Sequence, residues 1–131
     1  MRIIKVRTHK KVEFIEITRS VEEVVKENKI KEGICVIFSP HTTAGLLINE
    51  NADPSVRKDI IGQLEKLVPQ DGEYSHLEGN ADAHIKSSLL GNSLNLIIHE
   101  GELILGTWQG IYFCEFDGPR ERKVYLKLIS D

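Results

Sequence analysis

The sequence predicts an α+β fold in a single domain, residues 1–131, built from a largely antiparallel or mixed β-sheet with two or three helices packed on it. Three observations support this prediction. About seven short runs are rich in β-branched and aromatic residues, as strands are. Two or three segments carry apolar residues at helical spacing. The helices do not alternate regularly with the strands, which argues against a parallel α/β sheet.

The strands are predicted from their composition and length. Residues 2–8 and 11–18 are β-rich runs close together in the sequence, so we expect them to form an opening hairpin. Residues 34–38 are continuously apolar, which at this length favours a central strand covered on both faces. Further strands are expected over residues 94–99, 102–105, 111–116 and 124–129.

The helices are predicted from their start and stop signals. Ser20 followed by Glu23 has the capping-box pattern and indicates a first helix that stops before Gly33. Asp53 as N-cap and Pro54 in the first turn indicate the start of a second helix. A third helix is expected after Asn80, with an apolar stripe of Ala81, Ile85 and Leu89, ending at Gly91.

Two histidines flank the start of the third helix. His84 lies one turn after Asn80, and Gly79 permits a sharp bend that turns His76 back toward His84. Converging imidazoles suit zinc or another divalent metal, with further ligands from elsewhere in the chain. In the alternative interpretation Asn80 caps the helix, Asp82 complements its dipole, and both histidines sit half-exposed beside the core.

A second group of polar residues follows the apolar strand. The segment from Ser39 to Gly45 contains His41, Thr42 and Thr43, and strand ends of this kind commonly line sites. An ordinary polar turn, with hydroxyls bonded to their own backbone, explains the same residues. The segment is not a phosphate-binding Walker loop, because the glycine spacing and the lysine are missing.

Two other residues each allow a functional and a structural interpretation. Glycines on both sides of Trp108 favour a close turn that presents the indole, whereas a core tryptophan is the structural alternative. Arg120 lies in a turn after Asp117, where it can meet a phosphate or simply pair with that aspartate.

Composition restricts the classes of function. The chain has 17 Lys and Arg against 20 Asp and Glu, a formal net charge of -3, so no overall positive field would attract nucleic acid or an anionic membrane. Cys35 and Cys114 lie in apolar runs without a paired-cysteine motif, so we expect buried thiols in a reducing compartment. No run is long and apolar enough for a membrane span. These features predict a cytoplasmic protein.

Four blocks of sequence carry a resemblance to a known family. They are residues 41–44 (His-Thr-Thr-Ala), 48–54 (Ile-Asn-Glu-Asn-Ala-Asp-Pro), 80–84 (Asn-Ala-Asp-Ala-His) and 105–111 (Leu-Gly-Thr-Trp-Gln-Gly-Ile). Together they resemble the YjbQ family, described as secondary thiamine-phosphate synthases, and the resemblance runs over nearly the whole chain. It implies a homotrimer, a bound divalent metal (zinc or magnesium), and a small phosphorylated metabolite as ligand.

The resemblance implies a weak activity that joins hydroxymethylpyrimidine diphosphate to a thiazole phosphate and releases diphosphate, so the site has to stabilise negative charge on the leaving group. The metal ligands implied are His41, His76 and His84. Substrate contacts fall to Thr42, Thr43, Asn51, Asn80 and Trp108, the last as a stacking surface. Catalytic roles fall to Asp82, Gln109 and Arg120, with Arg120 as a further phosphate contact. A non-catalytic metal-binding trimer and a metal-dependent hydrolase of a phosphorylated metabolite are the alternatives.

Overall fold

The computed structural model describes residues 1–131 and contains two antiparallel sheets. The larger sheet has the strand order β1 (Arg2–Arg7), β8 (Glu121–Ser130), β3 (Gly33–Phe38), β5 (Ser93–His99) and β6 (Glu102–Leu103). The smaller sheet has the order β2 (Glu13–Glu16), β7 (Gln109–Glu115) and β4 (Ala44–Glu50). Every strand pair is antiparallel. The α+β class is therefore confirmed.

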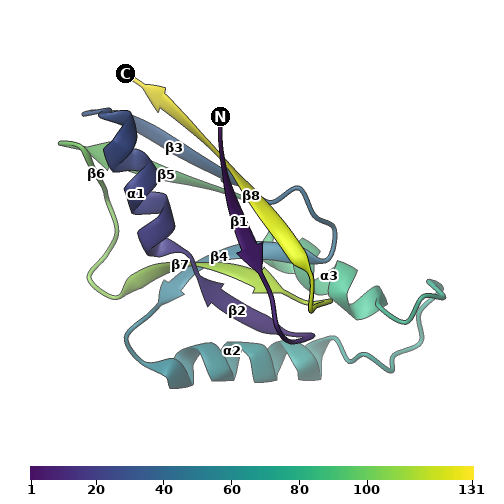
Figure 1. The fold of residues 1–131 in the computed structure, drawn as a ribbon. Helices are drawn as coiled ribbons and strands as arrows, with labels where there is room; N and C mark the ends of the chain where they lie inside the picture. The colour runs from purple at the N-terminus through teal and green to yellow at the C-terminus, as the bar shows by residue number, and fades with distance from the viewer.

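Three helices complete the fold, α1 (Thr18–Asn28), α2 (Pro54–Leu67) and α3 (Ala81–Leu90). Figure 1 shows α2 running beneath the smaller sheet, α3 beside it, and α1 alongside the larger sheet near β6. No helix combines the length and the apolar character needed to cross a membrane.

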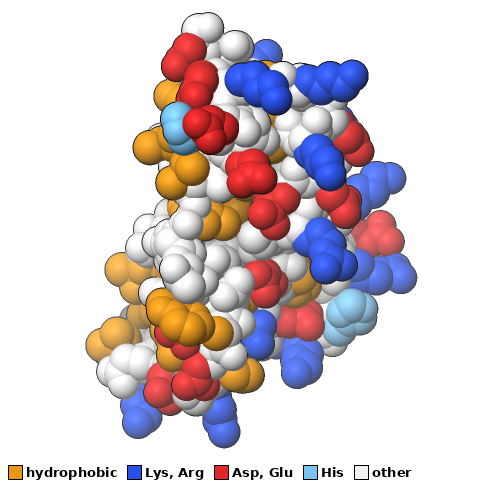
Figure 2. Space-filling view, turned by 90° about the vertical axis from the view of Figure 1, so that its left-hand side faces the viewer, with side chains coloured by type: hydrophobic (Ala, Val, Ile, Leu, Met, Phe, Trp, Pro, Cys, Tyr) orange, Lys and Arg blue, Asp and Glu red, His pale blue; other side chains and the backbone are white.

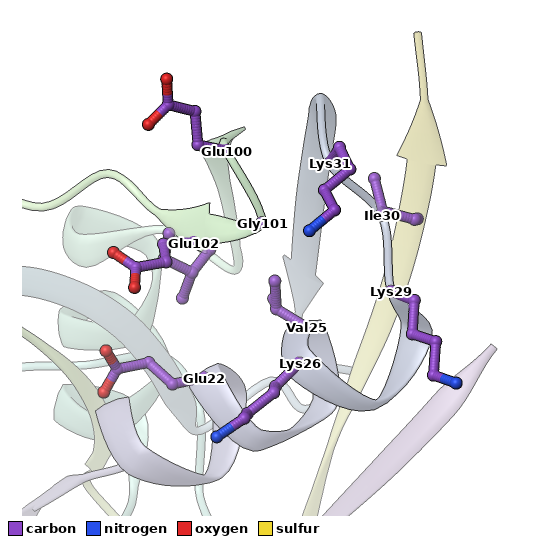
Figure 3. Close-up of a pocket in the computed structure, with 10 residues that line it drawn as sticks. Glu22, Val25, Lys26, Lys29, Ile30, Lys31, Glu100, Gly101 and Glu102 are labelled. Carbon is purple, nitrogen blue, oxygen red and sulfur yellow. The ribbon is translucent and has the colours of Figure 1, made fainter.

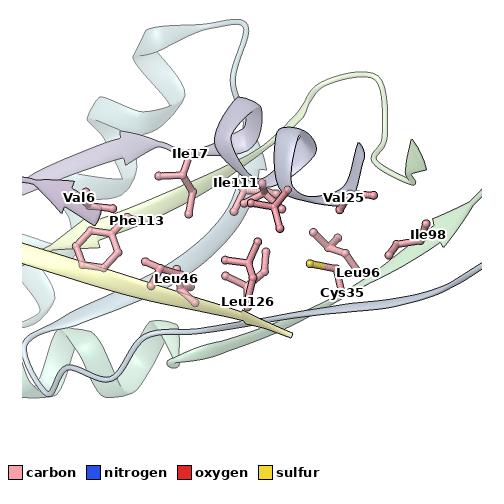
Figure 4. Close-up of a cluster of buried hydrophobic side chains, with 14 of the residues drawn as sticks. Val6, Ile17, Val25, Cys35, Leu46, Leu96, Ile98, Ile111, Phe113 and Leu126 are labelled. Atoms are coloured by element: carbon pink, nitrogen blue, oxygen red, sulfur yellow. The ribbon is translucent and has the colours of Figure 1, made fainter. Parts of the chain in front are cut away.

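The main hydrophobic core lies between the two sheets and α1. Val25 of α1, Cys35 of β3, Leu46 of β4, Phe113 of β7 and Leu126 of β8 all point into it (Figure 4). A second, smaller cluster occupies the other side of the smaller sheet, against α2 and α3. The molecule is thus layered as sheet, sheet and helices, and the outer face of the larger sheet carries no covering layer.

Strand β7 supplies both clusters because its side chains alternate. Ile111 and Phe113 lie in the main core, whereas Tyr112 and Cys114 lie in the second cluster. The strand itself is predicted over residues 111–116, and its two faces follow from the ordinary alternation of side chains in a strand. Period-two alternation is a local property of the strand, so the pattern reveals it without knowledge of the partners.

The predicted opening hairpin is wrong. Strand β1 pairs with β8, and β2 pairs with β7, so the two N-terminal strands belong to different sheets. Strand propensity depends on nearby residues, whereas the choice of partner depends on the apolar faces that distant segments offer.

Helix starts are predicted with mixed success. Helix α2 begins as expected: the Asp53 side chain accepts a hydrogen bond from the Ser55 backbone N–H at 2.9 Å, and Pro54 follows in the first turn. Helix α1 does not begin with the Ser20 capping box; it starts at Thr18, after a residue that makes no side-chain cap. Thr18 Oγ1 instead accepts a hydrogen bond from Ile111 N–H at 2.8 Å, which ties the helix start to β7.

Strand β3 is central in the larger sheet, as predicted, but it is covered on one face only. Cys35 and Ile37 are fully buried, while Ile34 and Phe38 on the opposite face are exposed. A fully apolar strand with one uncovered face leaves apolar surface in water.

Helix α3 buries a different face from the one predicted. Ile85 and Leu89 of the expected stripe are 38% and 60% exposed, whereas Asp82 and Lys86 are completely buried. The helix ends as predicted at Gly91, whose φ of 91° lies in the region that glycine adopts most readily. Charge pairing, rather than the predicted apolar stripe, therefore determines which face of α3 is buried.

Both cysteines are buried free thiols, as predicted. Burial raises the pKa of Cys35 to about 11 and raises the pKa of Cys114 as well. Neither thiol is ionised near neutral pH, so neither acts as a nucleophile or a metal ligand in the candidate site.

Candidate functional site

The two histidines around α3 converge. The ring centroids of His76 and His84 are 5.2 Å apart, and Gly79 between them has a φ of 82°, which provides the predicted bend. Zinc–nitrogen bonds of about 2.0–2.1 Å at a tetrahedral angle place two imidazole centroids about 5 Å apart. The spacing therefore fits two ligands of one metal ion.

A hollow of about 360 Å³ adjoins this pair. Its walls come from the loop between β3 and β4, from α3, and from the turn after α3. The lining residues are His41, Thr42, His84, Ser87, Ser88, Gly91 and Asn92. The Ser87 and Ser88 hydroxyls donate hydrogen bonds to the carbonyls of Ala44 and His84. Thr42 is exposed and its hydroxyl makes no hydrogen bond within the chain, so it can serve a ligand.

His41 reaches the same hollow from the other side. Its Nε2 lies 3.1 Å from both the backbone N and the backbone O of Lys123, so only Nδ1 remains for another partner. Burial and the nearby charge of Arg122 lower the pKa of His41, which keeps the ring neutral at neutral pH. Neutral imidazole is the form that binds metals.

The three predicted metal ligands are not a complete set within one chain. His76 and His84 adjoin each other, and His41 shares a wall with His84. No group of three His, Cys, Asp or Glu side chains has an arrangement that could hold an ion. Two imidazoles thus fit a metal, and further ligands would have to be water, substrate or a second subunit.

Asp82, predicted as a catalytic residue, is instead part of a buried ion-pair network. Lys86 Nζ and Lys11 Nζ donate to Asp82 Oδ2 at 3.1 and 3.3 Å, and Lys86 also pairs with Glu65 at 3.2 Å. Burial raises the pKa of Asp82, but the Lys86 hydrogen bond and the Lys11 charge outweigh it and leave the pKa below its usual value. Asp82 Oδ1 is buried without a hydrogen-bond partner.

Asn80 precedes α3, as predicted, but its side chain does not cap the helix. Asn80 Nδ2 donates to Asp117 Oδ2 at 2.9 Å, and its Oδ1 is buried without a partner. Asp117 Oδ2 also accepts a hydrogen bond from Arg120 Nη2 at 3.0 Å. Of the two roles foreseen for Arg120, the pairing with Asp117 is the one that the structure contains.

Thr43, predicted to contact phosphate, is buried in a second ion-pair network. Arg122 donates to Glu115 through Nε at 2.8 Å and also through Nη2, and the same Nη2 donates to Thr43 Oγ1 at 2.9 Å. Thr8 Oγ1 donates to Glu115 Oε1 at 2.8 Å. Burial raises the pKa of Glu115, but the bonds from Arg122 and other donors bring it below its usual value. Thr43 thus helps to fix Arg122 beside His41.

The remaining predicted residues lie at the other end of the β4–β7 ladder. Ala44 pairs with Glu115 near the hollow, whereas Glu50 pairs with Gln109 at the far end. Because β4 spans seven residues, the two ends are about 20 Å apart. Asn51 N–H donates to the carbonyl of Trp108, and the Trp108 side chain is 61% exposed. Within one chain, the predicted site residues therefore form two separate groups, one at each end of the β4–β7 ladder.

Sequence analysis missed the charged partners of this region, Lys11, Lys86, Glu115 and Arg122. One signal was present: Asp82 and Lys86 are four residues apart, the spacing of a helical ion pair. A second was Glu115, an acid within a strand of aromatic residues that is buried only if it is paired. Its partner Arg122 comes from the next strand and no local pattern reveals it.

Comparison with known proteins gives a consistent result. The model of the family described as UPF0047 protein YjbQ-like matches residues 2–131. The UPF0047 protein MJ1081 of Methanocaldococcus jannaschii is 55% identical over 127 residues, which cover 97% of this chain and 92% of that protein. The UPF0047 protein YugU of Bacillus subtilis is 50% identical over 131 residues, covering 99% of both.

A solved structure agrees with these relatives. The crystal structure of an uncharacterised conserved protein of the YjbQ/UPF0047 family from Clostridium acetobutylicum superposes with a TM-score of 0.97 at 53% identity, and the match covers 98% of this chain and 100% of that one. Sequence and fold agree over essentially the full length. The chain therefore belongs to the YjbQ-like UPF0047 family.

Proposed function

We propose that this protein is a metal-assisted transferase that joins hydroxymethylpyrimidine diphosphate to a thiazole phosphate and releases diphosphate. The observation that carries the proposal is the convergence of His76 and His84 beside a hollow that also contains His41 and Thr42. These groups are suited to holding a phosphorylated metabolite together with a divalent cation such as zinc or magnesium.

The difficulty of this reaction is the charge that develops on the departing diphosphate. A divalent metal supplies positive charge beside those oxygens when it is bound. The exposed Thr42 hydroxyl can donate to a phosphate oxygen at the rim of the hollow. Neutral His41 offers Nδ1, because Nε2 is already held by the Lys123 backbone.

The ionisation of the nearby acids favours group transfer over hydrolysis. Asp82 and Glu115 are both buried and paired with cations, so neither is free to remove a proton from water. Transfer with a departing diphosphate needs charge stabilisation more than it needs a carboxylate base. A metal-dependent hydrolase would use the same histidines and would have to rely on the metal alone to activate water.

We further propose that the protein assembles as a homotrimer through the part of the larger sheet's outer face that β3, β5 and the C-terminal end of β8 form, which leaves the Lys5–Lys123 pair at the opposite end of β8 uncovered. Ile34 pairs across the strands with Ile97 on one side and Ile129 on the other, and all three side chains are exposed. Phe38 and Tyr125 extend this face, with stacked rings 6.5 Å apart. Contiguous apolar surface on a sheet favours burial against another subunit.

Product formation from the two precursors tests the transferase proposal. We expect the metal-loaded wild type to form thiamine phosphate and His84→Ala to lose about a hundredfold in rate. His99→Ala, at the end of β5, where His99 pairs with Glu32 and does not line the hollow, should match wild type. Release of phosphate from either precursor alone would favour a hydrolase. Tight metal binding without either reaction would favour a non-catalytic metal-binding trimer.

A further inference from the structure

A groove of about 630 Å³ lies along the paired strands β1 and β8, on the far side of His41 from the hollow described above. Eight residues line it, and its charged members are Lys5, Arg7, Arg122, Lys123 and a single acid, Glu121. Four basic side chains against one acid give this groove a local positive charge in a chain whose formal net charge is -3.

Pairing leaves two of these cations uncompensated. Glu121 binds Arg7 at 3.0 Å, and Arg122 is neutralised by the buried Glu115. Lys5 and Lys123 have no acidic partner, and they are directly opposite each other in the β1–β8 register. The Lys123 ammonium lies 5.5 Å from the centroid of the Tyr125 ring, a weak contact that does not neutralise its charge. Like charges directly opposite each other in an antiparallel pair are destabilising, and the side chains of such a pair point to the same face. An anion between them would remove this repulsion.

A second groove on the molecule has balanced charges, so the excess of positive charge is a property of the groove at β1 and β8. It measures about 540 Å³ beside α1 and β6, and three lysines line it together with three glutamates. Figure 3 shows the acidic side chains Glu22, Glu100 and Glu102 around this space together with Lys26 and Lys31. Basic and acidic side chains also intermingle over the upper and right-hand parts of the face in Figure 2. The groove at β1 and β8 lacks this balance.

The position of the groove connects it to the candidate site. His41 lines both the groove and the hollow that contains His84. The Lys123 backbone holds His41 in place through Nε2, and the Lys123 side chain lines the groove. An anion in the groove would therefore lie beside His41, with His84 across the hollow on the other side of that imidazole.

We propose that this groove binds the diphosphate group of a phosphorylated metabolite between the ammonium groups of Lys5 and Lys123. The identity of the ligand rests on the proposed function, whereas the existence of an anion site rests on the groove itself. Two cations on neighbouring strands suit an anion that carries charge on more than one phosphate group. The lysine ammonium binds phosphate well because it acts as a compact positive charge.

Calorimetric titration with inorganic diphosphate tests the site without any reaction. We expect Lys5→Gln and Lys123→Gln each to weaken diphosphate binding about tenfold, because each removes a charge-assisted contact. Lys26→Gln, in the balanced groove, is the matched control and should bind like wild type. Wild-type affinity should also fall as sodium chloride is added, since the site is exposed.

Thermal unfolding of the same proteins separates binding from folding. Without ligand, Lys5→Gln should unfold at the wild-type temperature or above it, because the variant relieves the repulsion with Lys123. With diphosphate, its stabilisation should be smaller than that of wild type. Equal diphosphate affinity in all four proteins, or no binding to wild type, overturns the site. Thiamine phosphate formation without diphosphate binding in the groove would refute the anion site but support the transferase proposal. Diphosphate binding in the groove without product formation would support the anion site and refute the transferase proposal.

Discussion

Lys86 Nζ lies 3.1 Å from Asp82 Oδ2 on α3, and both side chains are completely excluded from solvent. The pair is stable there because Lys11 supplies a second cation to Asp82 and Glu65 a second acid to Lys86. Burial of ions costs several kcal/mol each unless partners compensate them. This network therefore determines how α3 sits against the smaller sheet, and with it the position of His84.

Breaking this pair should destabilise the fold. In Lys86→Met the Asp82 carboxylate remains buried with Lys11 alone, so we expect a loss of about 3 kcal/mol in the free energy of unfolding. Urea denaturation at pH 7 measures it. Lys66→Met, at an exposed position of α2, is the control and should change stability by less than about 0.5 kcal/mol. A Lys86→Met protein as stable as the control would show that the network contributes little.

Stability should fall in acid. The folded pKa values of Asp82 and Glu115 are both lowered, so their contribution is present above the unfolded pKa values of about 4 and is lost as the pH falls through the folded ones. We expect the urea midpoint to decline modestly below about pH 6.5, where His41 takes up a proton more readily in the unfolded chain than in the folded one, and to drop further below about pH 4. Glu115→Gln should start lower, because Arg122 loses its partner, and should show a shallower drop. If the urea midpoint of Glu115→Gln fell with pH as steeply as that of wild type, Glu115 would not contribute to the acid sensitivity.

Metal affinity should depend on the two converging histidines. We expect His76→Ala and His84→Ala each to weaken zinc binding about tenfold or more, because each removes one of two adjacent ligands. Calorimetric titration of the metal-free protein with zinc measures this. His9→Ala carries a histidine change at an exposed position paired with Glu13 and should retain full affinity. Zinc binding that survives both substitutions would place the metal elsewhere.

The assembly should depend on the outer face of the larger sheet. Ile97 is 62% exposed in the single chain, so Ile97→Asp should cost the folded subunit little while placing a charge in the proposed interface. We expect sedimentation at micromolar concentration to show trimers for wild type and monomers for this variant. Leu67→Asp, at a position 66% exposed on α2, provides the comparison and should remain trimeric. A monomeric wild type would refute the proposed assembly.

Local sequence patterns predicted the parts of the site that depend on a few adjacent residues. Gly79 indicated the bend that brings His76 to His84, and Asp53 with Pro54 marked the start of α2. These features depend on backbone conformation and on hydrogen bonds within one turn, so a short window of sequence contains their cause. The segment from Ser39 to Gly45 was likewise placed at a strand end, where His41 meets His84 across the hollow.

Contacts between distant segments decided the rest. The stripe of Ala81, Ile85 and Leu89 indicated one buried face of α3, but Lys11 and Glu65 pair with the charged row and turn that row inward. The seven residues of β4 likewise hold Thr43 and Asn51 about 20 Å apart, although family resemblance assigns both to one site. Sequence alone determined which side chains were available and how each short segment folds. Only the tertiary structure decided which charges meet, because burial of an ion depends on partners far away in the chain.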